Sequence, residues 1–192
     1  MELNELRADL ALRTKRGIPF VWASLFLWAG VMAVWCLPLP GLLFRNSATI
    51  FCALAQVPAA ALISQAMKLE FHLKDNPLQG AAILCALNQL LYFPIAAALS
   101  SIVPGGVVLI LALISGAHLL PFSWLYHSRS YLIMSLLIPL TIFLIGFGLP
   151  QNKIYLLAAT MVVLKSVLVT WLSIEITAGS EKAGRTNSLN RS

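Results

Sequence analysis

The chain alternates between long apolar runs and short polar segments, and this pattern predicts its architecture. The runs are close to the roughly 20 residues that a helix needs to cross the hydrocarbon core of a bilayer, which is about 30 Å thick. They are continuously apolar rather than alternating, which excludes the strands of a membrane β-barrel. We therefore expect an all-α fold, a polytopic bundle of six transmembrane helices at residues 17–37, 47–67, 78–102, 105–120, 131–149 and 154–176.

The two ends of the chain differ from the apolar region between them. Near the N-terminus, Leu3, Leu6 and Leu10 lie on one helical stripe, with charged side chains elsewhere. Such an amphipathic arm is expected to lie in the membrane interface, with its basic end against anionic lipid headgroups. The C-terminal end is polar and of mixed charge, which predicts disorder. The expected division is an arm at 1–16, a transmembrane domain at 17–176 and a disordered tail at 177–192.

Composition narrows the class of protein further. Of the 192 residues, 59% are hydrophobic and 10% are charged, whereas soluble domains carry roughly a quarter charged residues. A water-soluble globular fold is therefore excluded, and so is intrinsic disorder, which requires few apolar residues and much charge. The net charge of +6 does not indicate nucleic acid as a partner, because no basic face interleaved with aromatic residues accompanies it.

The basic residues are distributed unequally between the two ends of the predicted spans. Ten Lys and Arg residues lie in the arm, in the loops after the second and fourth spans, and in the tail. The other end carries only Arg45 and Lys153. Positive charge accumulates on the cytoplasmic side of membrane proteins. We therefore expect both termini to face the cytoplasm.

Lys165 is the most informative side chain, because it lies at the centre of the sixth run. Inserting a lysine at that depth costs about 2.5–3.5 kcal/mol, and an ionisable residue within the membrane is by default a functional candidate. No Asp or Glu lies inside a predicted span, and Glu175 is ten residues away at the cytoplasmic end. The alternative is a structural lysine that backbone carbonyls hold.

Uncharged polar groups near the same depth are the candidate partners of Lys165. The amides are Gln56 in the second run and Asn88 and Gln89 in the third. We expect these side chains to converge with Lys165 on one polar pocket that binds a small anionic ligand. The alternative is that the amides only cross-link neighbouring helices.

Three central prolines add backbone acceptors to this prediction. Each proline removes a helix hydrogen bond and frees the carbonyl four residues earlier. Pro58, Pro94 and Pro139 free the carbonyls of Leu54, Leu90 and Ser135 in this way. At mid-membrane depth such carbonyls require a neighbour, a water or a ligand. We expect them to line the same pocket, unless the prolines only kink their helices.

The histidines follow a different pattern. His118 begins a polar and aromatic stretch after the fourth run, and we include it among the ligand-binding candidates as part of a cytoplasmic gate or headgroup site. An interfacial anchor is the alternative. His72, His118 and His127 form no pair spaced by four residues, so we expect no metal site. The three cysteines show no paired spacing, and we expect no disulfide framework.

Three functions remain open. The leading one is a membrane protein that binds or passes a small polar or anionic molecule through a mid-membrane pocket. The second is a non-catalytic scaffold for another membrane protein, which a fully packed interior would favour. The third is an enzyme that acts on lipid with His118 and His127 as acid and base. No cofactor or nucleophile motif is present, and small residues such as Ala55 and Ala59 are compatible with a homo-oligomer.

The six-run layout and the stretch from His118 to Tyr131 resemble a family of small, uncharacterised bacterial membrane proteins known only as a domain of unknown function. This resemblance implies a bacterial inner membrane and supplies neither an activity nor site residues. The lysine in the last run is also similar to the retinal-carrying lysine of microbial rhodopsins. The chain departs from rhodopsins in its six runs rather than seven and in lacking an intramembrane carboxylate. We therefore expect no retinal and no other cofactor.

Overall fold

The computed structural model describes residues 2–39, 41–70, 73–100, 102–103 and 105–189, and the side chains of 100, 151 and 180–189 lie outside this description, as does His72. The described part of the chain is helical and contains no strand. Its longer helices are α1 (Leu3–Arg13), α2 (Ile18–Cys36), α3 (Leu42–Leu54), α4 (Gln56–Ala66), α5 (Leu78–Asn88), α6 (Phe93–Ser100), α7 (Gly106–Ala117), α8 (Leu120–Leu125), α9 (Arg129–Gly146) and α10 (Tyr155–Leu189). Short 3-10 turns are η1 (Lys15–Gly17), η2 (Gln89–Tyr92) and η3 (Gln151–Lys153).

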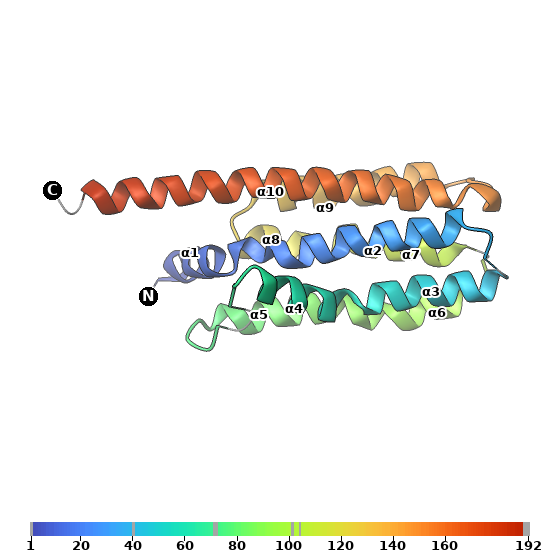
Figure 1. The fold of residues 1–192 in the computed structure, drawn as a ribbon, viewed down its shortest axis with the longest axis horizontal. Coiled ribbons are helices and arrows are strands. Elements are labelled where there is room, and N and C mark those ends of the chain that lie inside the picture. The colour runs from blue at the N-terminus through green and yellow to red at the C-terminus, as the bar shows by residue number, and fades with distance from the viewer. Residues whose placement is uncertain (1, 40, 71–72, 101, 104, 190–192) are drawn as a thin grey trace.

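The long helices run side by side along one axis, and the two ends of the chain lie at the same end of the bundle (Figure 1). We call this the terminal end and the opposite one the far end. Helix α2 packs against α10 and α4, and α7 packs against α9. The α9–α10 pair and the α3–α6 group thereby lie on opposite sides of α2 and α7 (Figure 1).

Five helices are long and apolar enough to cross a membrane, and the bent pair α3–α4 makes a sixth if it is counted as one span. Each of the six predicted runs coincides with one of these segments. Helices α3 and α4 meet at an angle of 41°. The break falls at Ala55, close to the carbonyl of Leu54 with which the ring of Pro58 would clash in a straight helix.

The other two central prolines have different effects. Pro94 follows η2, so the third predicted run changes from α-helix to a tighter turn and back again. Pro139 lies inside α9, which continues to Gly146. Gly116 on α7 lies so close that a Cβ built on it would be 2.6 Å from Pro139 Cδ. Glycine therefore allows α7 and α9 to approach closely at this point.

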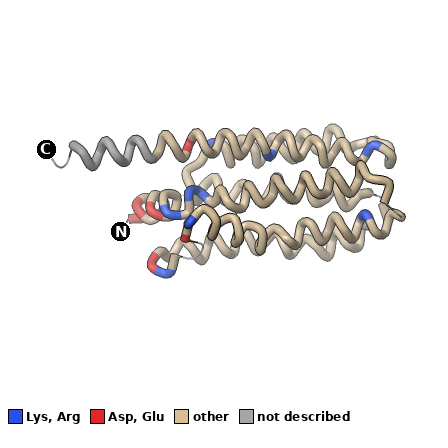
Figure 2. Tube along the Cα trace, viewed as in Figure 1, with Lys and Arg blue, Asp and Glu red and all other residues tan. Residues whose placement is uncertain are grey.

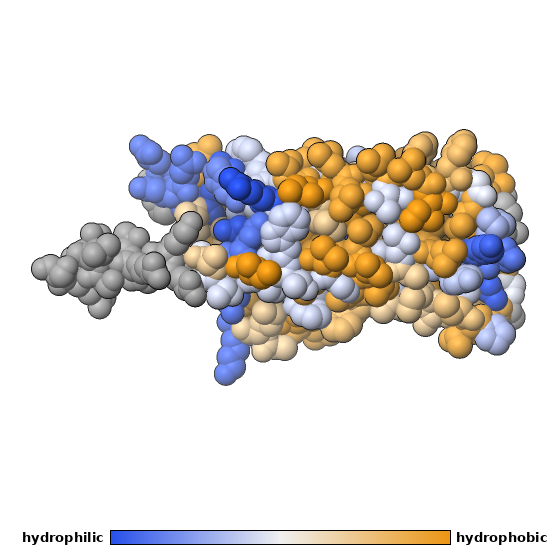
Figure 3. Space-filling model, turned by 90° about the horizontal axis from the view of Figure 1, so that it is seen from above, coloured by the Kyte–Doolittle hydropathy of each residue, from blue (hydrophilic) through white to orange (hydrophobic). Residues whose placement is uncertain are grey.

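Charged and apolar residues are separated along the bundle axis. Lys, Arg, Asp and Glu gather mainly at the two ends, with apolar chain between them (Figure 2). The surface between the ends is a broad hydrophobic band (Figure 3), and it includes exposed side chains such as Leu43, Phe51 and Leu84. Helices satisfy their own backbone groups, so a bundle with such a band is suited to hydrocarbon.

Protein contacts hold α1 against the terminal end of the bundle. The buried guanidinium of Arg7 donates to the Trp124 carbonyl and lies 4.5 Å from the centre of the Trp124 ring. Leu10 is fully buried, and Asn76 Nδ2 donates to Leu6 O at 2.9 Å. The sequence predicts headgroups as the partners of this arm, whereas the described contacts of Arg7 are with the protein itself.

The last helix extends into the segment for which the sequence predicts disorder. Disorder is expected after Thr177, but α10 continues as a helix to Leu189. Extending an existing helix costs much less than starting one, because each added residue gains a hydrogen bond without a new nucleus. The polar composition of the segment indicates solvent, and it does not by itself prevent continuation of the helix.

Candidate functional site: a cavity that ends at a buried lysine

Lys165 lies on the inner face of α10 and is 1% exposed. Its ammonium does not extend toward either end of the bundle, because Nζ donates a hydrogen bond to the carbonyl of Ser115 at 3.0 Å. Ser115 belongs to α7, one of the helices against which α10 packs. The buried cation is therefore held at the centre of the bundle by a backbone oxygen.

The end of α7 explains why this oxygen can accept from Lys165. In an uninterrupted helix, the N–H of Leu119 would donate to Ser115 O, but here it donates to Gly116 O at 3.1 Å. Helix α7 ends at Ala117, so its last carbonyls have no partner within the helix. The C-terminal end of a helix also carries partial negative charge, which favours a cation.

A cavity of about 220 Å³ extends from the terminal end of the bundle to Lys165. Four of the five predicted ligand-binding residues line it, namely Lys165, Gln56, Gln89 and His118. Asn88 is not among the described lining residues, and its side chain is exposed. The predicted convergence therefore does not include Asn88. Successive residues of a helix point about 100° apart, and Asn88 falls on the exposed side of the helix while Gln89 faces the cavity.

The freed carbonyls contribute less than the sequence predicts. Of the residues that carry them, Leu90 lines the cavity, whereas Leu54 and Ser135 are not among its described lining residues. The acceptor of Lys165 comes instead from Ser115, at a helix end that the positions of the central prolines do not indicate.

Ser24 is a further polar group at the inner end of the cavity. Its side chain lies on α2 and is 3% exposed, and its Oγ has no hydrogen-bond partner among the described residues. Ser24 was not among the predicted residues, although it is the one hydroxyl-bearing residue in the run 17–37. A lone hydroxyl inside an otherwise apolar run is the signal that could have indicated it.

A second, smaller cavity of about 20 Å³ lies beyond Ser24 and also borders Gln56, Gln89 and Ser115. Two tryptophans close the bundle around it and toward the far end. Trp28 Nε1 donates to Ser115 Oγ at 3.4 Å, and Trp35 Nε1 donates to Thr49 Oγ1 at 3.0 Å. The inner end of the main cavity therefore lies beside two tryptophan hydrogen bonds that link neighbouring helices.

The mouth of the main cavity lies under α1 and the loop before α5. Arg13 pairs with Glu70 at 2.7 Å and with Asp75 at 2.6 Å, and Glu70 itself lines the mouth. The turn at Gly17 faces Tyr126, whose hydroxyl would be 3.2 Å from a Cβ at that position. Burial raises the pKa of Tyr126 to about 12, so its phenol stays neutral at physiological pH.

The histidines do not form one site. His118 lines the cavity, and its Nδ1 donates to Ile114 O at 3.2 Å. His127 is exposed in the loop after α8 and is not among the described lining residues. An acid–base pair made of these two residues is therefore not assembled. No group of three or more His, Cys, Asp or Glu residues that could hold a metal occurs in the part of the chain that was described.

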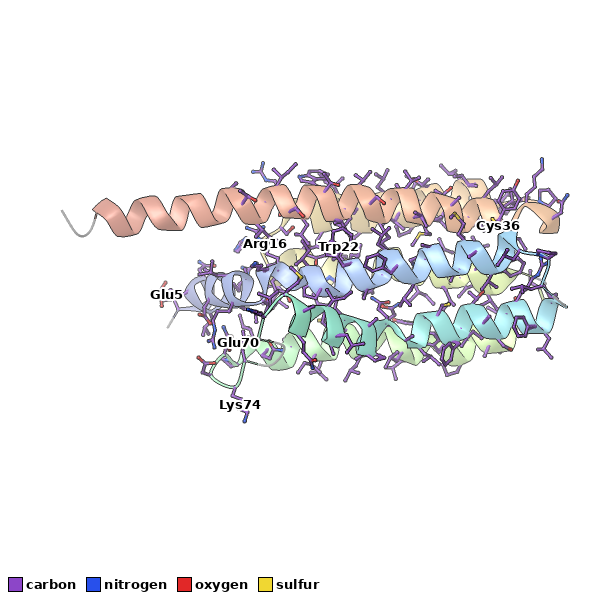
Figure 4. All side chains as sticks on the ribbon, in the orientation of Figure 1. Glu5, Arg16, Trp22, Cys36, Glu70 and Lys74 are labelled. Carbon is purple, nitrogen blue, oxygen red and sulfur yellow. The ribbon has the colours of Figure 1, made fainter. Side chains whose placement is uncertain are left out.

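A second polar cluster lies at the terminal end, where α2, α9 and α10 meet. We call it the Glu175 cluster, and it consists of Arg16, Ser128, Ser130, Tyr131 and Glu175. Arg16 Nη1 donates to Glu175 Oε2 at 2.7 Å, and Figure 4 places Arg16 where the turn before α2 faces α10. Ser128 Oγ and the N–H of Ser130 donate to the same carboxylate at 2.7 and 2.8 Å. Glu175 therefore holds the first turn of α9.

Comparison with known proteins places the chain in a family but assigns no activity. No curated protein and no solved structure matches it. A family model described as a family of unknown function, DUF7010, matches residues 3–175, which cover the predicted spans almost completely. The match agrees with the resemblance to an uncharacterised domain. The chain therefore belongs to DUF7010.

Proposed function

We propose that this protein binds a small anionic molecule in the cavity that ends at Lys165. The observation that supports this most strongly is the imbalance of charge in the cavity. Glu70 is the one acid among the described lining residues, and it lies at the mouth, where Arg13 neutralises it. At the inner end, the hydrogen-bond acceptor that the described residues provide for the Lys165 ammonium is a neutral carbonyl. An anion would complete this arrangement and offset the desolvation of the cation.

The neighbouring side chains fit the same ligand. Gln56 and Gln89 carry amide N–H donors, and the Ser24 hydroxyl can donate as well. Binding sites for small molecules typically combine apolar walls with a few convergent polar groups, as this cavity does. Ligand binding is a step that sensors and transporters share. The mouth of the cavity lies at the terminal end, which is compatible with access from that side.

The cavity also weighs against the two alternative functions. A purely structural scaffold needs no internal space, yet this cavity of about 220 Å³ is larger than the engineered cavity of about 150 Å³ that binds benzene. The enzyme hypothesis needs His118 and His127 together, and they lie in separate environments. Ligand binding is the function that uses the observed space and the buried charge.

We further propose six membrane spans in a bacterial inner membrane, with both termini in the cytoplasm and lipids around the hydrophobic band. The excess of Lys and Arg at the terminal end supports this orientation. A reporter that is active only in the cytoplasm should be active when fused to the C-terminus and inactive when inserted beside Lys153. The opposite result would reverse the orientation.

We also propose that the protein forms a homo-oligomer, because small residues spaced by four allow helices of two copies to approach closely.

The binding proposal is tested by thermal unfolding of the purified full-length protein in detergent, with sodium phosphate, acetate or benzoate added. A ligand that binds the folded state raises stability by RT ln(1 + [L]/Kd), about 2.7 kcal/mol at 100 times Kd. At least one of these anions should raise the Tm of the native protein in a concentration-dependent way. Lys165→Met should abolish the shift.

The matched control is Lys153→Met, which removes an exposed lysine at the far end and should leave the shift unchanged. Gel filtration verifies that both variants are folded and monodisperse. The proposal is overturned if none of the three anions stabilises the native protein, or if Lys165→Met responds as the native protein does.

A further inference from the structure

The cavity has a polar inner end and a polar mouth, but the wall between them is apolar. Hydrocarbon side chains from four helices form this wall, namely Val21, Val57, Ala82, Leu87, Leu90 and Phe122. Along α5 and η2 the lining extends from Gln79 to Leu90, which is about 16 Å at 1.5 Å per residue. A hydrated inorganic ion would leave most of this wall without a complementary surface, whereas an apolar group would bury it favourably.

The volume limits the size of such a ligand. About 220 Å³ is of the order of the engineered cavity of about 150 Å³ that binds benzene, and a whole phospholipid with two acyl chains does not fit such a volume. One aromatic ring or a short acyl chain, together with one carboxylate, is of the right order. The volume of the cavity and the length of its apolar wall therefore indicate a short ligand with a charged head and an apolar body.

The wall of the cavity is also part of the outer surface of the bundle. Ile83 and Leu87 lie one turn apart on α5, and both line the cavity while remaining 37% and 44% exposed. Helix α4 packs mainly against α2, whereas α5 packs mainly against α1 and α8. The wall of the cavity therefore reaches the outer surface of the bundle at Ile83 and Leu87, within the hydrophobic band.

We propose that the ligand is a small amphipathic carboxylate, aromatic or short-chain, whose carboxylate binds at Lys165 and whose apolar body lies against α4 and α5. This inference rests on the proposed function, because it assigns a chemical class to the same anion. The carboxylate accepts from Lys165 and from the nearby amides, and the body replaces water along Val57 and Leu87.

The experiment compares benzoate with acetate, phosphate and benzyl alcohol as ligands of the purified full-length protein. Benzoate and acetate share a carboxylate, whereas benzyl alcohol has the ring without the charge. We expect the apparent Kd for benzoate, from the Tm shift, to be at least tenfold lower than those for the other three. Leu87→Asn, which places an amide on the wall, should weaken benzoate at least tenfold and leave acetate unchanged.

The matched control for the wall is Leu84→Asn, on the same helix but at a position that is 69% exposed and not among the described lining residues. It should bind benzoate as the native protein does. If acetate or phosphate binds as tightly as benzoate and depends on Lys165, the amphipathic class is wrong and the anion site stands. If benzyl alcohol equals benzoate, or Leu84→Asn equals Leu87→Asn, the class is also wrong. If no anion binds, the proposed function itself fails.

Discussion

Two basic residues, the partly buried Arg16 and the fully buried Lys165, lie in contrasting environments. Arg16 belongs to the Glu175 cluster, where a carboxylate accepts from its guanidinium at 2.7 Å. That carboxylate also accepts from Ser128 and from the N–H of Ser130. Lys165 is recorded with a single neutral acceptor at 3.0 Å, and it borders a cavity. One cation is paired within the protein, and the other is left with capacity for a ligand.

This difference indicates different roles for the Glu175 cluster and for Lys165. An arginine presents its donors in a rigid planar fork that suits a carboxylate, and Glu175 also lies at the N-terminus of α9, where a negative charge is favourable. The Glu175 cluster therefore ties three helices together. A lysine ammonium has three donors on a flexible stem, and the one recorded bond uses one of them. We therefore expect Lys165 to contribute less to the stability of the fold than to ligand binding.

The largest expected effect is that of Glu175→Gln. This change removes the countercharge of the partly buried Arg16 and weakens three hydrogen bonds to the carboxylate, which costs about 3 kcal/mol. Reversible unfolding in mixed micelles should show a free energy of unfolding reduced by that amount. Lys74→Gln, at an exposed position in the loop before α5 (Figure 4), is the control and should have little effect.

Lys165→Met provides the contrast to Glu175→Gln in the same measurement. It removes one hydrogen bond, worth about 0.5–1.5 kcal/mol, but it also removes the cost of burying a charge. The two changes should nearly cancel, so the free energy of unfolding should shift by less than about 1 kcal/mol. A loss as large as that of Glu175→Gln would show that Lys165 is a structural residue and would remove the distinction between the clusters.

A smaller effect is expected for Gly116→Ala, which tests how the acceptor of Lys165 is positioned. The new methyl group would be 2.6 Å from Pro139 Cδ and 2.7 Å from Ile138 Cγ2, so α7 and α9 must separate. Overpacking of this kind costs about 1–3 kcal/mol and should also shift the adjacent Ser115 carbonyl.

Thermal unfolding and the benzoate response together measure this effect of Gly116→Ala. Gly80→Ala on α5 is the control, since a Cβ there meets nothing within 4 Å. It should be neutral or stabilising by up to about 1 kcal/mol, because alanine favours the helix more than glycine does. Equal stability of the two variants would contradict the close approach of α7 to α9.

The smallest effect is expected at the solvent-exposed mouth. Hydrogen bonds from Arg13 hold the pKa of Asp75 below its ordinary value of 3.8. Since the pKa is lowered in the folded state, the contribution of this pair is complete above pH 3.8 and is lost as the pH falls through the lowered pKa. A spin label at Ala8→Cys, in a chain with its other cysteines replaced, should therefore become more mobile only in strong acid.

The control for this titration is Asp75→Asn, which removes the carboxylate. In that variant the label should be more mobile already at pH 6, and its mobility should change less as acid is added. If the native protein keeps the same label mobility down to pH 2, then contacts other than the Arg13 pairs hold α1 in place.

Particular residues show how far the sequence predicts the site. Gln56, Gln89 and Lys165 were predicted from their depth in apolar runs, because the position of a residue along a membrane-spanning helix gives its depth in the bilayer. Asn88 satisfied the same criterion and faces away from the cavity, since depth says nothing about the direction in which a side chain points. Ser115 was not predicted as the acceptor, because its free carbonyl depends on where α7 ends.

By itself, the sequence determined the helical class, the positions of the apolar segments and the arrangement of charge at the two ends. These properties vary along the membrane normal. The thickness of the hydrocarbon layer and the cost of burying charge determine them from short stretches of sequence. Only the tertiary structure decided which faces meet, that Lys165 binds Ser115 and that α4 and α5 leave a cavity beside α2. Those features depend on rotation and packing between helices distant in the chain, and local hydropathy does not encode them.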